Sequence, residues 1–163
     1  MKNVVVFDLD GTLADLMPRL HLMPTNELHL TDSWTQFNKA CDSDLPINDT
    51  IAVCNAMWDA GYMVIVLTGR SDIAKDETMQ WLDDHIVFYD RLVMRPHNDN
   101  RKDYIIKEEY LRNVVGLENI IAAWDDNPSV VAHFRSMGIT TYQVVPDIVR
   151  NDLMSHGVEE LKC

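Results

Sequence analysis

Short apolar runs alternate with segments of helical character along most of this chain, and few folds accommodate that order. Four segments have helical spacing of their apolar residues: 47–60, 76–85, 102–115, and one that begins at Asn127 and Pro128 and ends near Gly138. Strands that alternate with helices form a parallel sheet with helices packed on it. The sequence therefore predicts an α/β fold, whose strands are residues 4–7, 62–67, 91–94, 120–124 and 140–145.

Residues 14–46 interrupt this alternation. They contain three prolines and a polar stretch around Trp34. We expect an insertion after the first strand that forms a small cap over the site, within a single domain spanning residues 1–163. Trp34 and Phe37, three residues apart, could face a base or a sugar, or they could form the cap's own small core.

Composition and charge limit which partners and which cellular compartment we expect for this protein. A formal net charge of -12 and a pI near 4.7 argue against a broad electrostatic grip on nucleic acid, so a polyanionic substrate must be held locally. Three widely spaced cysteines, Cys41, Cys54 and Cys163, suggest neither a disulfide framework nor a zinc site. With no signal pattern and no apolar run long enough to cross a bilayer, we expect a cytoplasmic protein without a membrane partner.

The first apolar run leads into D-L-D-G-T-L, residues 8–13. Asp8 and Asp10 are two apart on an extended segment and therefore point the same way. Two carboxylates held close together resist joint ionisation unless a metal or a proton neutralises them. Gly11 permits close approach of the backbone to an anion, and the Thr12 hydroxyl is expected to bond neighbouring backbone.

Three further segments carry polar groups where strands end or helices begin. Thr68, Gly69 and Arg70 follow the second strand, where backbone N–H groups, a hydroxyl and a guanidinium can bind a phosphoryl group. Lys102 lies in a first helical turn, where it opposes the helix dipole unless an anion joins it; it could also be a solvated lysine. Adjacent acids, Asp125 and Asp126, follow the fourth strand and favour Mg²⁺, although Asp126 could instead cap the next helix.

The D-L-D-G-T-L segment and the three segments just described, in this order, resemble the motifs of the haloacid dehalogenase (HAD) superfamily of Mg²⁺-dependent phosphatases. The resemblance implies a three-layer HAD-like (Rossmannoid) sheet, with Asp8 as the nucleophile that forms an aspartyl-phosphate and Asp10 as general acid/base. It assigns phosphate binding to Thr68 and makes Lys102 the lysine that bridges nucleophile and phosphate, with Asp99 as its orienting partner. The implied Mg²⁺ ligands are Asp8, the backbone carbonyl of Asp10, and the acids Asp125 and Asp126.

A closer resemblance is to the 3′-phosphatase domain of bacteriophage polynucleotide kinase/phosphatase. It is carried by D-N-R-K-D-Y-I-I-K-E-E-Y, residues 99–110, and by Arg19, eleven residues after Asp8. The resemblance implies that Arg19, Gly69 and Arg70 bind the phosphate or its neighbour on the strand. The chain has no G-x-x-x-x-G-K-[ST] segment, so any kinase or ligase that works with it would be separate.

The expected activity is therefore removal of a 3′-phosphate from polynucleotide ends by a Mg²⁺-dependent phosphomonoesterase. One alternative is a 5′-nucleotidase or deoxynucleotidase acting on mononucleotides, which the acidic charge slightly favours. A catalytically silent HAD-like binding protein is another. The intact set Asp8, Asp10, Thr68, Lys102 and Asp125 argues against that last reading.

Overall fold

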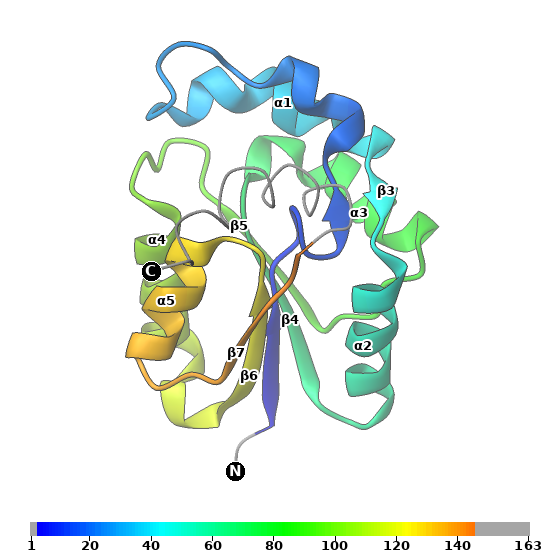
Figure 1. The fold of residues 1–163 in the computed structure, drawn as a ribbon, viewed down its shortest axis with the longest axis vertical. Helices are drawn as coiled ribbons and strands as arrows, with labels where there is room; N and C mark the ends of the chain where they lie inside the picture. The colour runs from blue at the N-terminus through cyan, green and yellow to red at the C-terminus, as the bar shows by residue number, and fades with distance from the viewer. Residues whose placement is uncertain (1–2, 146–163) are drawn as a thin grey trace, which may run out of the picture.

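The computed structural model describes residues 3–145 of the chain; Cys163 and the two ends of the expected domain lie outside that range. A five-stranded parallel sheet forms its centre, with strand order β5-β4-β1-β6-β7 (Figure 1). All five predicted strands are present, and the α/β prediction is confirmed. The strands are β1 (Val4–Phe7), β4 (Met63–Ser71), β5 (Arg91–Arg95), β6 (Ile120–Asp125) and β7 (Thr141–Gln143).

Helices cover both faces of the sheet, because alternate residues of each central strand point to opposite sides. Val5 and Phe7 of β1 pack with the helices α2 (Asn48–Asp59) and α3 (Lys75–Asp84). Val4 and Val6 pack on the other face, with α5 (Pro128–Ser136) and the segment that follows α4 (Asp103–Tyr110). The expected helix over residues 102–115 is α-helical only to Tyr110 and continues as a π-helical turn, Leu111–Val115.

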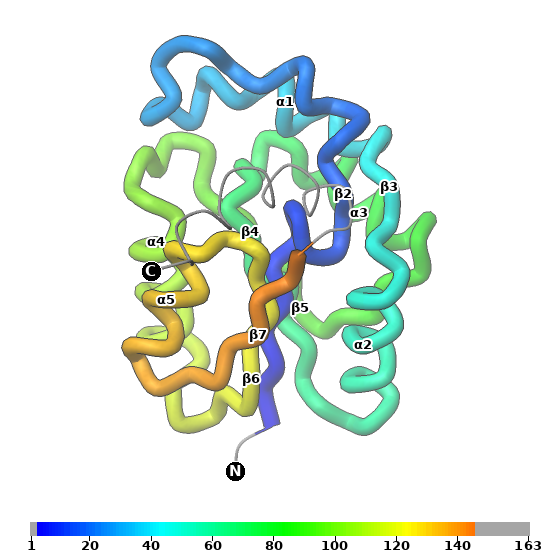
Figure 2. Tube along the Cα trace, viewed as in Figure 1, coloured from blue at the N-terminus to red at the C-terminus, as the bar shows by residue number. Residues whose placement is uncertain are grey.

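The cap segment, residues 14–46, leaves and rejoins the core through two short strands. These are β2 (Ala14–Asp15) and β3 (Leu45–Pro46), which pair antiparallel at its base. Between them lie three 3₁₀ turns (Met17–Leu22, Thr31–Trp34, Ala40–Ser43) and one short helix, α1 (Thr35–Lys39). The tube in Figure 2 shows this segment lying across the end of the sheet where β1 finishes.

In the part of the chain that the structure describes, no helix combines the length and the apolar character that spanning a bilayer requires.

Candidate active site

Three carboxylates gather at the carboxyl end of the sheet. Asp8 directly follows β1 and Asp125 is the last residue of β6, so the pairing of these strands places the two side by side. One carboxylate oxygen from each of Asp8, Asp125 and Asp126 lies within 4.8 Å of the others. Gly11 has φ +82°, and a side chain there would collide with the Asp126 carboxylate. The motif glycine therefore makes room for the acidic cluster.

A buried lysine, Lys107, lies among these acids. Its Nζ donates to Asp8 Oδ1 at 2.9 Å and to Asp125 Oδ2 at 2.8 Å, and it is 3.0 Å from Asp103 Oδ2. The structure thus corrects the sequence prediction: Lys107, not Lys102, contacts Asp8. Lys102 is exposed at the N-cap of α4, with its Nζ 5.9 Å from the centre of the Tyr104 ring. The helix begins one residue later than expected, and its buried face carries positions 103 and 107, four apart.

The partner expected for the lysine also changes. Asp99 binds Arg101, whose Nη2 lies 2.6 Å from Asp99 Oδ2, and within the described residues no ion pair joins Asp99 to Lys102 or Lys107. Asp103 takes the place beside the lysine instead. A side chain at Gly69 would collide with the Asp103 carboxylate, so a larger residue there would displace Asp103 from its place beside the lysine.

Burial sets the protonation of this cluster. Burial, together with Asp125 and Asp126, raises the pKa of Asp8 well above its usual range, and Lys107 opposes that rise. Burial and the neighbouring Asp125 raise the pKa of Asp126 to about 7. Burial by itself would lower the pKa of Lys107, but Asp8, Asp103 and Asp125 outweigh it and keep the lysine charged. One buried ammonium is therefore shared among several acids that tend to hold protons when no other cation is present.

Asp10 belongs to a second buried group. Its carboxylate accepts from Arg19 Nη2 at 2.7 Å and from both Nε and Nη2 of Arg70. The same two guanidinium groups bind Asp44, with Arg19 Nε and Nη2 at 2.6 and 2.8 Å and Arg70 Nη2 at 3.1 Å. Burial would raise the pKa of Asp10, but Arg70 and Arg19 outweigh it and lower that pKa. Arg19 and Arg70, expected to bind phosphate, thus hold Asp10 as a carboxylate here.

The structure agrees with some of the remaining predictions and contradicts others. Thr68 is buried, and its hydroxyl accepts from the backbone N–H of Arg70 at 3.1 Å. The hydroxyl of Thr12 finds no partner among the described residues, so the prediction that it bonds neighbouring backbone is wrong. Asn127, and not Asp126, caps α5 by accepting from Ser129 N. A cavity of about 330 Å³ brings together Asp8, Asp10, Thr68, Gly69, Arg70, Asp125 and Asp126.

Sequence reasoning missed four residues of the site: Asp44, Arg95, Asp103 and Lys107. Arg95 donates to the carbonyl oxygens of Gly69, Asp99 and Arg101 and lies 3.4 Å from Asp103, so it fixes the segment that leads into α4. Asp103 and Lys107 carried a usable signal, since opposite charges four apart on a helix lie on one face. Asp44 carried none, because its role depends on how the cap segment folds back.

The donor set fits a hard divalent cation. Asp8, Asp125 and Asp126 offer carboxylate oxygens, the ligands that Mg²⁺ accepts. Among the described residues, Lys107 is the one cation in contact with this cluster, and it touches Asp8 and Asp125 but not Asp126. The cluster therefore has room for further positive charge.

Comparisons with known proteins agree with this fold. The structure superposes on a haloacid dehalogenase-like hydrolase from Streptococcus pneumoniae with a TM-score of 0.62, at 15% identity, over 96% of this chain and 91% of that one. It also superposes on a chain of the Pnkp1/Rnl/Hen1 complex with a TM-score of 0.74 and 31% identity, over 88% of this chain and 46% of that one. The chain is a HAD-type phosphatase.

Within that class the family can be stated. The family described as the polynucleotide kinase PNKP phosphatase domain matches residues 2–147, and the chain belongs to it. A protein of Autographa californica nuclear polyhedrosis virus, named "Putative bifunctional polynucleotide kinase/RNA ligase", is 32% identical over 143 residues, which is 85% of this chain and 19% of the viral protein. This chain therefore spans about a fifth of the viral relative and just under half of the Pnkp1 chain.

Proposed function

We propose that this phosphatase removes the 3′-phosphate from polynucleotide ends through an aspartyl-phosphate formed on Asp8. The observation that carries the proposal is the contact of Asp8 with Lys107 beside Asp10, at the carboxyl edge of a parallel sheet, where open α/β folds bind their ligands. The family and the named activities of the relatives support a substrate with a nucleic-acid end.

In the first step, a carboxylate oxygen of Asp8 attacks phosphorus in line with the ester oxygen that leaves. Lys107 is placed to stabilise charge on the phosphoryl oxygens as it develops, and Thr68 and Gly69 line the same cavity. Bound Mg²⁺, held by Asp8, Asp125, Asp126 and the carbonyl oxygen of Asp10, would supply neutralisation of the attacking carboxylate and of the phosphoryl oxygens.

Asp10 transfers a proton in each of the two steps. Its contacts with Arg19 and Arg70 lower its pKa, which suits the second step, where a carboxylate takes a proton from the water that hydrolyses the aspartyl-phosphate. The first step needs the protonated acid. We propose that a phosphate drawing the guanidinium of Arg70 away from Asp10 raises the pKa of Asp10, so that it can protonate the leaving oxygen.

The mononucleotide alternative uses the same core chemistry. The two proposals differ in the leaving group: a polynucleotide continues beyond the first nucleoside, whereas a mononucleotide ends there. A kinase or ligase acting on the same ends is part of the proposal, because the relatives' names combine these activities.

The decisive experiment measures phosphate release with Mg²⁺ from a 3′-phosphorylated oligonucleotide, a 5′-phosphorylated oligonucleotide, a 3′-mononucleotide and a 5′-mononucleotide. The Asp8→Asn variant serves as the blank and should show no turnover. Preference for the 3′-phosphorylated strand supports the proposal, whereas preference for mononucleotides replaces it with the nucleotidase reading. Full activity of Asp8→Asn would remove Asp8 as the nucleophile.

A further inference from the structure

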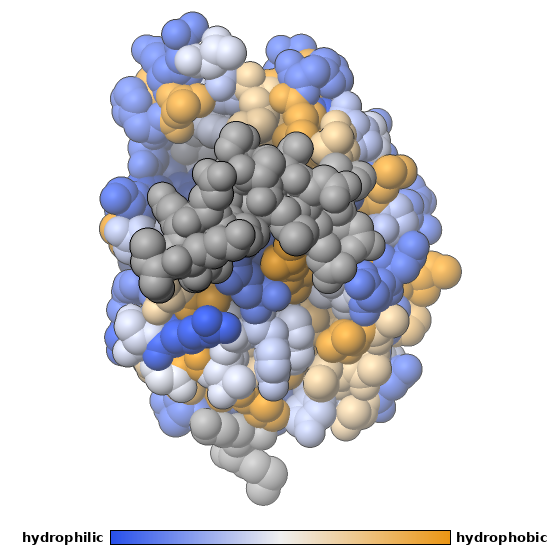
Figure 3. Space-filling model, in the orientation of Figure 1, coloured by the Kyte–Doolittle hydropathy of each residue, from blue (hydrophilic) through white to orange (hydrophobic). Residues whose placement is uncertain are grey.

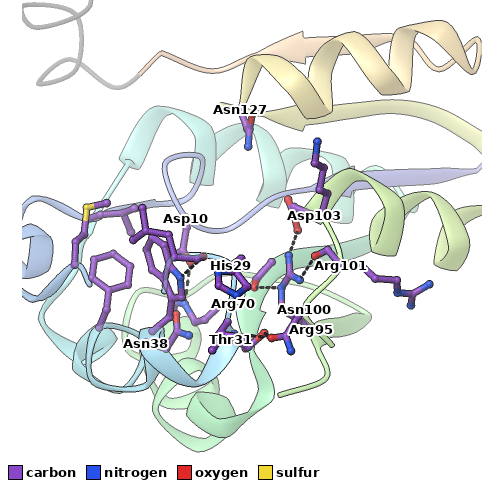
Figure 4. A pocket seen from close by; sticks show the side chains of 18 residues that line it. Asp10, His29, Thr31, Asn38, Arg70, Arg95, Asn100, Arg101, Asp103 and Asn127 are labelled. Atoms are coloured by element: carbon purple, nitrogen blue, oxygen red, sulfur yellow. Dashed lines mark hydrogen bonds and ion pairs between the residues drawn. The ribbon is translucent and has the colours of Figure 1, made fainter. Parts of the chain in front are cut away.

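A second, larger cavity lies between the cap segment and the core. It has a volume of about 530 Å³, and Figure 4 shows the side chains that line it. It shares five lining residues with the cavity that holds the carboxylates: Asp10, Gly69, Arg70, Asp103 and Asn127. A group bound at Asp8 can therefore extend into this space, which is larger than a phosphoryl group alone requires.

The wall that the cap segment contributes is mostly apolar, with His29, Thr31 and Asn38 as its polar members. Met23 and Leu28 line the cavity and still expose 44% and 57% of their surface, so the cap's own packing does not cover them. Trp34 lies half-buried in the same wall, held edge-on to Phe37 and donating from Nε1 to the carbonyl oxygen of Leu28 at 3.0 Å. Phe37 is buried and packs under the Arg19 guanidinium. Of the two aromatic residues considered from the sequence, Phe37 is core and Trp34 is available to a ligand.

The wall on the core side carries a net positive charge, because its four cationic residues outnumber its two aspartates, Asp10 and Asp103. Arg70, Arg95, Arg101 and Lys102 line it. The three arginines already have partners: Arg70 binds Asp10, Arg95 binds carbonyl oxygens, and Arg101 binds Asp99 and Glu109. Over residues 3–145, Lys102 forms no ion pair. Lys102 is therefore the lining cation whose charge remains to be matched.

An apolar aromatic wall facing an unmatched cation is complementary to a nucleoside joined to a further phosphate. We infer that this cavity binds the terminal nucleoside of the phosphorylated strand, with its base against Trp34 and the adjoining phosphodiester at Lys102. The inference rests on the proposed function. It gives Lys102 a part in strand binding, separate from the reacting phosphate, and makes this contact the one that a mononucleotide cannot form.

Kinetics of the full chain test both halves of the inference. KM is measured for a 3′-phosphorylated oligonucleotide, a 3′-mononucleotide and glycerol phosphate, which has no base. Trp34→Ala should raise KM for both nucleotide substrates about tenfold relative to glycerol phosphate, because base stacking is lost. Trp34→Phe, which keeps an aromatic ring against Phe37, should recover part of that loss. An unchanged KM for glycerol phosphate in Trp34→Ala separates loss of stacking from collapse of the cap, because a collapsed cap would affect all three substrates.

Lys102→Ala should raise KM for the strand by about tenfold more than KM for the mononucleotide. It should also reduce the slope of log KM against log salt for the strand by roughly 0.7, the value for one phosphate contact on a single strand. Lys75→Ala, an exposed lysine outside both cavities, is the matched control and should change neither quantity.

Equal effects of Lys102→Ala on strand and mononucleotide would overturn the assignment of the phosphodiester. Unchanged KM values in Trp34→Ala would overturn the assignment of the base. In either case a preference of the unaltered protein for the 3′-phosphorylated strand leaves the proposed function standing. If the unaltered protein hydrolyses glycerol phosphate but neither the oligonucleotide nor the mononucleotide, the proposed function and the inference fail together.

Discussion

At the level of single residues, the buried ammonium of Lys107 is the contact on which the carboxylate cluster depends. It touches Asp8, Asp103 and Asp125, and all three raise its pKa against the effect of burial. A buried charge that loses its partner is costly, so removing this lysine leaves at least two acids uncompensated. The lysine therefore contributes both to holding the site together and to the chemistry proposed for it.

Replacing Lys107 by Ala should lower turnover of a small aryl phosphate at least 100-fold, the loss typical of removing one donor to a developing oxyanion. Steady-state kinetics at saturating Mg²⁺ measure this, with Lys75→Ala as the control that keeps activity. Loss of turnover in Lys102→Ala together with retained turnover in Lys107→Ala would instead favour the lysine chosen from the sequence.

Asp44 carries the second residue-scale prediction. Its side chain is fully buried against Arg19 and Arg70. Asp44→Ala leaves two guanidinium groups with Asp10 as their shared carboxylate, and it should lower the free energy of unfolding by about 3–5 kcal/mol. Chemical denaturation measures this quantity. Asp42→Ala, an exposed acid two residues earlier, should stay within about 0.5 kcal/mol, and similar losses in both variants would contradict a specific role for Asp44.

At the level of single residues, the sequence predicted most of the site but not all of it. Asp8, Asp10, Thr68, Asp125 and Asp126 line one cavity, because four of them end or follow a strand of one parallel sheet and Thr68 lies toward the carboxyl end of β4. Lys102 was chosen because a lysine in a first helical turn was expected to meet an anion, but the structure exposes Lys102 and buries Lys107, farther along the helix, against Asp8. The two arginines were found, but their carboxylate partner was not, since no local pattern ties residue 44 to residue 19.

At the level of elements, the cap segment is fastened to the core by hydrogen bonds at one tip. Thr31 donates from its backbone N–H to Asn100 Oδ1 at 2.7 Å, and its hydroxyl donates to the carbonyl oxygen of Asp99 at 3.0 Å. His97 lies between Ser71 and Asp32, which joins the same turn to the end of β4. The loop between β5 and α4 is thus one place where the core holds the cap segment.

Asn100→Ala should free this tip. Because a typical hydrogen bond contributes about 1 kcal/mol, the amide of Thr31 should exchange with solvent roughly five to ten times faster. Hydrogen exchange read by NMR measures this, with amides of β1 unchanged. Asn98→Ala, an exposed asparagine in the same loop, should leave Thr31 as it was, and equal acceleration in both variants would mean that the loop, not the bond, holds the cap.

The same level shows why elements were easier to predict than their ends. Periodicity located all five strands, but β4 runs on to Ser71, through Thr68 and Gly69, because it pairs with β5 there across an irregular register. The cap was recognised only as a departure from periodicity. Its turns are 3₁₀ in type and too short to leave a pattern in the sequence.

At the level of the whole molecule, acidity is distributed unevenly. The face in Figure 3 shows hydrophilic side chains interspersed with separate apolar patches, as expected of a chain with net charge -12. Most acids are solvated, but a few are buried at the site, and burial raises the pKa of Asp44 to about 6 and that of Asp126 to about 7. Their protons therefore link folding to pH in a way that surface acids do not.

Both groups take up protons more readily in the folded chain than in the unfolded chain, where an aspartate pKa is about 3.9. Their contribution to stability is complete below about pH 4. As pH rises, the unfolded chain ionises first, so the contribution is lost between about pH 4 and pH 7. The metal-free protein should lose on the order of a few kcal/mol of unfolding free energy over that window, as measured by chemical denaturation in EDTA.

Mg²⁺ should reverse that loss, because a cation favours the ionised acids that the rise in pH creates. The increase in Tm caused by Mg²⁺ should accordingly be larger at pH 8 than at pH 5, where protons occupy the same oxygens. Asp126→Asn removes one of these acids and should reduce both the pH-dependent loss and the difference between the two Tm shifts. Equal Mg²⁺ shifts at both pH values would show that the cation does not compete with protons for this cluster, and would place its binding elsewhere on the acidic surface.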